Sequence, residues 1–246
     1  MKRRLLTISG LLGLAGLACV PAYLLAHNEP ELLAKASYVQ DLTDGRILFA
    51  KNPEAQLPLA SLTKLMTVYA ANREEVVTEE ESCFTLVTSS NEHAESIGAK
   101  LSDKPNSVMN IYAKHLGLAQ TFYLNSSGLD VSERLSGAYG SARDQVMLLT
   151  AFHHDYSELL RCTTKPKAAL EGPTLSNTNI NIGKTIGIIG SKTGFTDLAG
   201  GNLAVIVDVG INHPVAIVVL GSTAEGRFSD VETLVSHAIS ELSHSQ

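Results

Sequence analysis

The sequence is poor in several residue types. Its 246 residues include no tryptophan, and aromatic residues make up only 5% of the chain. Hydrophobic residues account for 44% and charged residues for 18%, a balance typical of folded globular proteins rather than disordered or repetitive ones. The length allows one large domain or two small ones.

Positive charge is also scarce. The chain has 19 lysines and arginines against 25 aspartates and glutamates, so its formal net charge is −6. Nucleic-acid-binding domains usually show the opposite balance, and we therefore expect no nucleic-acid partner. None of the eight histidines has the spacing of a metal site, so we expect neither a metal nor another cofactor.

Cysteine occurs three times, at Cys19, Cys83 and Cys162. Two cysteines beyond the N-terminal segment do not define a disulfide framework. In an oxidising compartment Cys83 and Cys162 are free to form a disulfide, and the sequence leaves both the paired and the unpaired state open.

Residues 1–26 have the pattern of an export segment. Three basic residues at positions 2–4 precede an apolar run, residues 5–26, which is also long enough to span a bilayer uncleaved. A cleaved signal, an uncleaved anchor and a lipoprotein site at Cys19 stay open as alternatives. Each predicts a periplasmic or otherwise extracytoplasmic domain, with membrane contact only through residues 5–26.

The periodicity of the rest of the chain predicts an α+β domain. We expect an N-terminal hairpin to pair with the late strands in one antiparallel sheet, with the middle helices on one face and the last helix on the other. Ser229 and Glu232 form the pattern of a capping box for that last helix. The expected strands are 37–42, 46–50, 186–194, 202–210 and 215–221, and the expected helices are 59–72, 92–101, 107–116, one following Ser141, and a final one from Ser229.

Ser61 and Lys64 are the first candidates for chemistry. Residues three apart share a face of a helix, so the hydroxyl and the amine would lie side by side. A lysine can activate a serine only if its pKa is lowered enough for the neutral amine to be present, and apolar neighbours and a helix N-terminus both lower it. An isolated Ser-x-x-Lys is nevertheless common and usually indicates an ordinary surface pair.

Two further clusters favour a catalytic role for Ser61 and Lys64 over an ordinary surface pair. Ser89-Ser90-Asn91 alone is typical of a turn, and Lys192-Thr193-Gly194 alone is typical of a strand end. In this order after Ser61-x-x-Lys64, they form the set used by serine acyl-enzymes such as penicillin-binding proteins and β-lactamases.

The sequence around these clusters resembles that of the D-alanyl-D-alanine carboxypeptidases. These are low-molecular-mass penicillin-binding proteins of serine peptidase family S11. The resemblance spans residues 36–242 and implies a β-lactamase/transpeptidase-like catalytic domain, an antiparallel sheet with helices on both faces. Its motifs are the stretches 36–39, 58–67, 125–130, 141–144, 191–196 and 219–221, with Arg227-Phe228.

The resemblance also implies roles for individual residues. Ser61 would be the nucleophile and Lys64 its base, while Ser89 would relay a proton to the leaving amine. For substrate binding, the resemblance implies that Asn91 and Lys192 hold the peptide and that Thr193 and Gly194 border the site at the terminal carboxylate. The N–H groups of Ser61 and Phe195 would form the oxyanion hole. Arg143 or Arg227 would supply a cation, unless these arginines form structural salt bridges.

Two departures from the family pattern flank the second cluster. The interval from Lys64 to Ser89 is shorter than usual, which predicts a more open site or a different placement of Ser89. The residue after Asn91 is Glu92, where the family usually has aspartate.

The implied partners are a peptidoglycan stem peptide ending in D-Ala-D-Ala, and β-lactams as covalent inhibitors. Two alternatives stay open. The first is a β-lactamase, which needs a carboxylate to activate the deacylating water. The candidate for that carboxylate, in Glu158-Leu159-Leu160, lacks a downstream asparagine. The other is a non-catalytic muropeptide-binding or penicillin-binding protein that retains the pocket.

Overall fold

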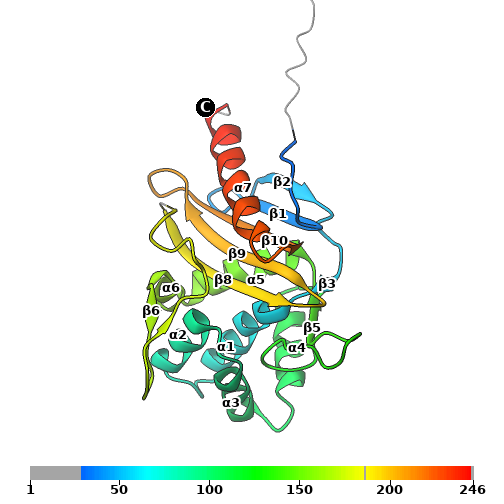
Figure 1. Cartoon of the computed structure of the whole chain (residues 1–246), viewed down its shortest axis with the longest axis vertical. Coiled ribbons are helices and arrows are strands. Elements are labelled where there is room, and N and C mark those ends of the chain that lie inside the picture. Colours follow the sequence, from blue (N-terminus) through cyan, green and yellow to red (C-terminus); the bar gives the residue numbers. More distant parts are fainter. Residues whose placement is uncertain (1–28, 186, 245–246) are drawn as a thin grey trace, which may run out of the picture.

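The computed structural model describes residues 29–185 and 187–244 (Figure 1). A five-stranded sheet crosses the middle of the molecule in the order β2-β1-β10-β9-β8, and each neighbouring pair is antiparallel. The predicted hairpin and the three predicted late strands therefore form one sheet, as expected. Its strands are β1 (Ala36–Asp41), β2 (Ile47–Lys51), β8 (Ile188–Thr196), β9 (Gly200–Asp208) and β10 (Pro214–Ser222).

Helices cover both faces of this sheet (Figure 1). The last helix, α7 (Gly226–Ser243), packs on one face against β9 and β10. The middle helices lie on the opposite side, with α5 in contact with β1, β9 and β10. They are α1 (Thr63–Arg73), α2 (Glu79–Thr88), α3 (Asn91–Leu101), α4 (Pro105–His115), α5 (Ala142–Asp155) and α6 (Ser157–Arg161).

Short elements complete the domain. Two of them are 3-10 helices, at Ala60–Leu62 and Cys162–Thr164. A three-stranded sheet has the order β3-β5-β4, and a separate hairpin joins β6 to β7. These strands are β3 (Leu57–Pro58), β4 (Phe122–Tyr123), β5 (Ala138–Gly140), β6 (Lys167–Ala168) and β7 (Leu175–Ser176).

The central strands are apolar on both faces because both faces are covered. In β10, Val218 packs in the core beneath the middle helices, while its neighbour Ile217 packs in the core beneath α7. Successive side chains of a strand point to opposite faces, so one strand contributes to both hydrophobic layers. This two-layer burial fixes the register of the sheet, and with it the position of Lys192 on β8.

The start of the last helix differs from the expectation. Helix α7 begins at Gly226, and Ser229 lies inside its first turn, where its hydroxyl donates to the Gly226 carbonyl at 3.0 Å. The predicted capping box at Ser229 is therefore wrong. The helix starts earlier because Thr223 Oγ1 accepts the Gly226 N–H at 2.8 Å, while Asp230 accepts the Ser222 hydroxyl and fixes the first turn against the end of β10.

Helix α2 is not among the helices expected from the sequence, and its first turn is strongly acidic. Thr78 and Glu81 form a capping box there, in which Thr78 Oγ1 accepts the Glu81 N–H and Glu81 Oε2 accepts the Thr78 N–H. The acidic residues of this stretch occupy the first turn, where the helix dipole favours negative charge. The pattern was present in the sequence, but high local charge concealed it.

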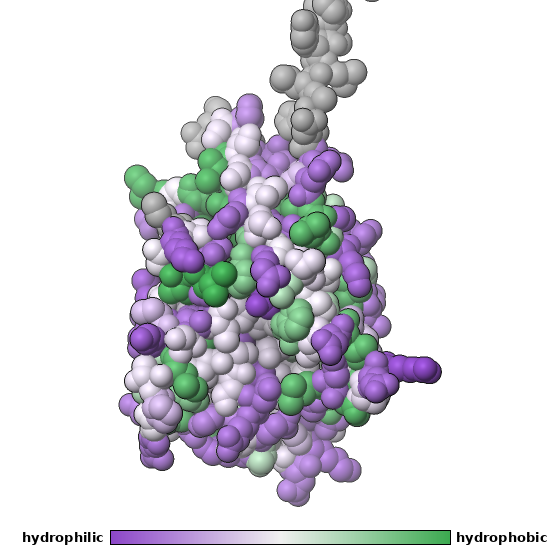
Figure 2. All heavy atoms as spheres, in the orientation of Figure 1, coloured by the Kyte–Doolittle hydropathy of each residue, from purple (hydrophilic) through white to green (hydrophobic). Residues whose placement is uncertain are grey.

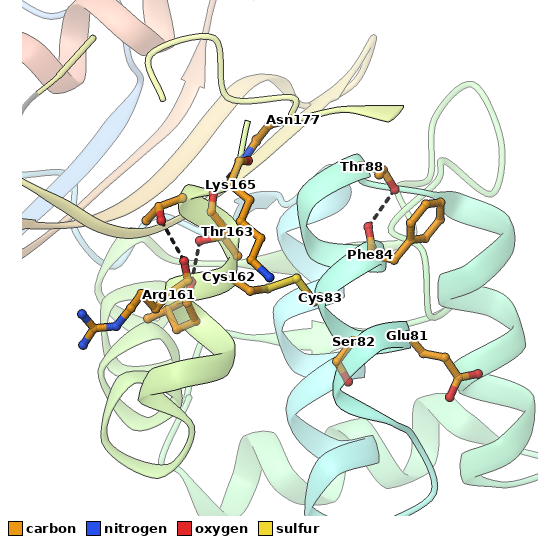
Figure 3. Close-up of a disulfide and its surroundings, with 12 residues drawn as sticks. Glu81, Ser82, Cys83, Phe84, Thr88, Arg161, Cys162, Thr163, Lys165 and Asn177 are labelled. Atoms are coloured by element: carbon orange, nitrogen blue, oxygen red, sulfur yellow. Dashed lines mark hydrogen bonds between the residues drawn. A yellow bond between two sulfur atoms is a disulfide. The ribbon is translucent and has the colours of Figure 1, made fainter. Parts of the chain in front are cut away.

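A disulfide joins α2 to the 3-10 helix at Cys162–Thr164 (Figure 3). It links Cys83 to Cys162, residues 79 apart in the sequence, with 5.8 Å between their Cα atoms. Of the two states left open by the sequence, the structure has the paired one. The disulfide therefore ties α2, the helix that lies between the end of α1 and Ser89, to the 3-10 helix that precedes β6.

Within residues 29–185 and 187–244, no helix is long and apolar enough to cross a bilayer. The same residues contain no group of three or more histidine, cysteine, aspartate or glutamate side chains suited to a metal. On the face shown in Figure 2, hydrophobic residues form small separate groups among polar ones. The predicted export segment, residues 1–26, lies outside the described residues.

Candidate active site

Ser61 lies where the 3-10 helix at Ala60–Leu62 continues into α1. Its Oγ is 2.7 Å from Lys64 Nζ, as the helical spacing predicted. Ala60 takes a positive φ of 48°, and Gly128 lies so close that a Cβ there would come within 1.9 Å of the Ala60 carbonyl oxygen. The loop that contains Gly128 therefore packs directly against the start of this helix and holds it in one conformation.

Lys64 is completely buried among polar partners. Its Nζ lies 2.7 Å from each of Ser61 Oγ, Asn91 Oδ1 and the Ser127 carbonyl oxygen. Burial lowers the pKa of Lys64 to about 7, and the charge of Glu95 partly opposes this by raising it. A neutral amine with two N–H bonds can donate to the amide and the carbonyl, which leaves its lone pair to accept the Ser61 hydroxyl proton.

Ser89 contacts the third cluster from the end of α2. It is the C-cap of that helix, with a left-handed φ of 58°, and its Oγ accepts a hydrogen bond from Lys192 Nζ at 2.8 Å. The short interval from Lys64 therefore does not displace Ser89 from the third cluster. Lys192 is also buried, and burial followed by the positive charges of Lys64 and Arg227 lowers its pKa well below the ordinary value.

Strand β8 approaches the nucleophile through Gly194. A Cβ at this position would lie 2.9 Å from the Leu59 carbonyl oxygen and 3.2 Å from the Ser61 nitrogen, so the close approach requires glycine. Phe195 follows on the strand with a side chain that is 50% exposed. The Ser61 nitrogen therefore lies against β8 at Gly194, and the N–H of Phe195 is the next one along this strand.

Asn202 on β9 fixes this approach. Its side-chain Nδ2 donates to the carbonyls of Pro58 and Leu59 at 2.9 and 3.0 Å, while its Oδ1 accepts the Gly221 N–H at 2.8 Å. Asn202 is fully buried and was not singled out from the sequence, because a lone asparagine in an apolar strand has no motif around it.

The two candidate arginines lie in different places. Arg227, in the first turn of α7, donates from Nη1 to the Gly194 carbonyl at 2.7 Å and so reaches the strand of the third cluster. Arg143, in the first turn of α5, is paired with Glu54 at 2.8 Å in the segment after β2. Of the two, the structure joins Arg227 to the site, whereas Arg143 forms the salt bridge considered as its alternative.

Thr193 has a partner that sequence reasoning also missed. Its Oγ1 lies 2.6 Å from Thr178 Oγ1, and Thr178 belongs to the segment between β7 and β8. Ser127 and Glu95 were missed in the same way. Of these, only Ser127 had a signal, because it lies in the stretch 125–130 that carries the family resemblance.

A family model described as D-alanyl-D-alanine carboxypeptidase, peptidase family S11, matches this chain over residues 24–105 and 71–224. The chain belongs to this family. The three clusters all lie within the matched residues. As a member of the S11 family, the chain is a serine peptidase.

Curated members of the family are similar over most of the chain. D-alanyl-D-alanine carboxypeptidase DacD of Escherichia coli is 26% identical, over 96% of this chain and 71% of the relative. A D-alanyl-D-alanine endopeptidase of Pseudomonas aeruginosa is 28% identical, over 78% of this chain and 72% of its own length. The relatives therefore include enzymes named for both activities.

Solved structures confirm the fold class. Penicillin-binding protein D2 from Listeria monocytogenes, in a cefotaxime-bound form, superposes with a TM-score of 0.78 and 27% identity, covering 85% of this chain and 98% of that one. The penicillin-binding, transpeptidase-like fold predicted from the sequence, an antiparallel sheet between layers of helices, is thus confirmed.

Proposed function

We propose that this chain removes the terminal D-alanine from peptidoglycan stem peptides that end in D-Ala-D-Ala, through an acyl-enzyme on Ser61. The observation that carries the proposal is the contact between Ser61 Oγ and the buried Lys64 amine, whose pKa is lowered to about 7. A base with such a pKa is both unprotonated in a large fraction of molecules at neutral pH and strong enough to accept the serine proton.

In the acylation step, Ser61 Oγ would attack the carbonyl carbon of the penultimate D-alanine while Lys64 takes its proton. The tetrahedral oxyanion would be bound by the N–H groups of Ser61 and Phe195, donors of the kind whose loss costs roughly 3–4 kcal/mol in the barrier. The C–N bond would then break as the leaving amine receives a proton through Ser89. D-alanine departs and the acyl group stays on Ser61.

Deacylation would repeat these steps with water as the nucleophile. Once the proton has left with D-alanine, Lys64 is again neutral and can deprotonate the water. Attack on the ester regenerates the Ser61 hydroxyl and releases the shortened peptide. No metal or cofactor is required in this scheme, because the side chains supply nucleophile, base, acid and oxyanion donors.

Substrate orientation would rest on the free carboxylate of the terminal D-alanine. Thr193 would donate to it, and Lys192 on β8 and Arg227, which donates to the Gly194 carbonyl, would supply positive potential. Asn91 would hold the peptide from α3 while keeping its contact with Lys64. A carboxylate in this position also distinguishes a chain end from an internal peptide bond, which favours carboxypeptidase activity.

β-Lactams are the second class of ligand that we propose, as covalent inhibitors attacked by Ser61. Listeria monocytogenes penicillin-binding protein D2, which is similar to this chain, has been solved with cefotaxime and with ampicillin. Rapid hydrolysis of the acyl-enzyme that a β-lactam forms with Ser61 is not expected here. The candidate carboxylate of the β-lactamase reading, Glu158, belongs to α6 and faces Arg161 at 3.6 Å with a side chain that is 77% exposed.

We also propose that the domain works outside the cytoplasm. The basic and apolar pattern of residues 1–26 supports export, and the disulfide between Cys83 and Cys162 is compatible with an oxidising compartment. Any membrane contact would come from residues 5–26.

The test is release of D-alanine from a diacyl-Lys-D-Ala-D-Ala peptide by the purified protein and by Ser61→Ala. We expect release by the parent and none by the variant, with labelling by a fluorescent penicillin lost in the same variant. Ser229→Ala, an exposed serine on α7, serves as the matched control and keeps both activities.

Three outcomes would count against the proposal. Penicillin labelling without D-alanine release by the parent would favour the non-catalytic binding protein. Fast penicillin hydrolysis would favour a β-lactamase. Cleavage of cross-linked muropeptide dimers much faster than of the free pentapeptide analogue would favour the endopeptidase activity for which some relatives are named.

A further inference from the structure

Glu95 contacts the loop that receives the Lys64 amine. It lies on α3 one turn after Asn91, and its Oε1 accepts the N–H of Ser127 at 3.1 Å. The carbonyl of the same Ser127 accepts from Lys64 Nζ at 2.7 Å. A single residue of the loop therefore links the Glu95 carboxylate to the base.

Other bonds fix the rest of that loop but not this N–H. Thr67 on α1 donates to the Ser126 carbonyl at 2.7 Å, and Asn125 Oδ1 accepts the Gly128 N–H at 2.7 Å. Helix α3 approaches closely because Gly98 has no side chain, and a Cβ there would lie 2.0 Å from Ser126 Oγ. At Ser127, the N–H is held by Glu95 and the carbonyl faces Lys64.

We propose that Glu95 is a positioning residue for the general base, which holds the Ser127 carbonyl against Lys64 and sets a negative charge close to the ammonium group that forms as Ser61 attacks. This proposal rests on the proposed function, since it assigns a purpose to the same base. It concerns a residue outside the three motifs, on an exposed stretch of α3.

The charges around Lys64 give the proposal a definite sign. Glu95 faces it from α3, Lys192 from β8, and Arg227 acts on Lys192 from α7. Among these groups Glu95 carries the only negative charge, and it raises the pKa of Lys64 against the effect of burial. Removing that charge should lower the pKa of Lys64, which makes more neutral amine available in mild acid but leaves a weaker base.

Two variants separate the two effects of Glu95. Glu95→Gln keeps an oxygen that can accept the Ser127 N–H but removes the charge. We expect the acidic limb of its kcat/KM profile to move to lower pH, so that its rate at pH 6, relative to its own plateau, rises about two- to fivefold. Glu95→Ala also loses the bond to Ser127, and its plateau kcat should fall about tenfold.

The control is Glu80→Gln, which removes one exposed charge from α2 and should leave the profile unchanged. The proposal is overturned if the Glu95→Gln profile coincides with that of the parent, or if Glu80→Gln shifts it equally. Equal plateau rates for Glu95→Ala and Glu95→Gln would overturn the role of the Ser127 bond. Thermal unfolding of each variant confirms that it is folded.

A second readout keeps the inference separate from the proposed function. The titration of Lys64 can be followed by NMR in protein labelled with ¹³C-lysine, whether or not the parent releases D-alanine. A parent without peptidase activity in which Glu95→Gln still titrates at lower pH would support the inference and reject the function. An unchanged titration would reject the inference alone.

Discussion

Removal of the disulfide between Cys83 and Cys162 should lower both stability and activity. The bond closes a loop of 79 residues. In the chain-entropy model a loop of this length contributes about 4.5 kcal/mol, and removal of native disulfides typically costs about 2–5 kcal/mol. For a domain of this size, that loss corresponds to a fall in Tm of roughly 5–15 °C.

The effect on activity follows from what the disulfide connects. On one side, α2 ends at Ser89, which accepts from Lys192. On the other, Thr163 Oγ1 accepts the N–H of Ser191, the residue before Lys192, at 2.8 Å. Both linked elements therefore contact β8 at the same point. Freeing them from each other should loosen the Ser89–Lys192 contact and lower kcat by about three- to tenfold.

The assay compares the parent with Cys83→Ala/Cys162→Ala in urea unfolding and in D-alanine release at a temperature where both are folded. Reduced parent should behave like the double variant. An unchanged unfolding midpoint and slope would refute the stabilising role of the bond. Lower stability with unchanged kcat would refute the argument that the bond positions Ser89.

Three further predictions concern the site and its supports. Gly194→Ala should lower kcat/KM at least tenfold in a folded protein, because its Cβ would lie 3.2 Å from the Ser61 nitrogen, and a normal rate would disprove this close approach. Asn202→Ala should lower the free energy of unfolding by about 2–4 kcal/mol in urea, since three buried hydrogen bonds are lost, and a change below 1 kcal/mol would contradict this. The kcat/KM of the parent should rise with pH through about 7 as Lys64 loses its proton, and Lys64→Arg, which stays charged, should be inactive at every pH; a flat profile would exclude Lys64 as the base.

The sequence by itself was sufficient for features set by local spacing. The contact between Ser61 and Lys64 follows from two positions three apart on a helix. Apolar runs separated by turn residues predicted the strands of the main sheet, together with the pairing of the hairpin with the late strands, while the full strand order came from the structure. Helix α2 shows the limit of this reasoning, because its capping signal at Thr78 and Glu81 lies within a run of acidic residues and the helix is absent from the expected elements.

Tertiary structure decided which distant residues complete the site. The Lys192–Ser89 contact joins positions 103 apart, and it exists because β8 lies at the edge of the sheet beside the end of α2. Arg143 and Arg227 are chemically alike in the sequence, yet only the start of α7 directs an arginine at Gly194. The lowered pKa of Lys64 likewise comes from burial by elements far apart in the chain. Local spacing determines which side chains share a turn, but desolvation and long-range contacts are properties of the packed layers.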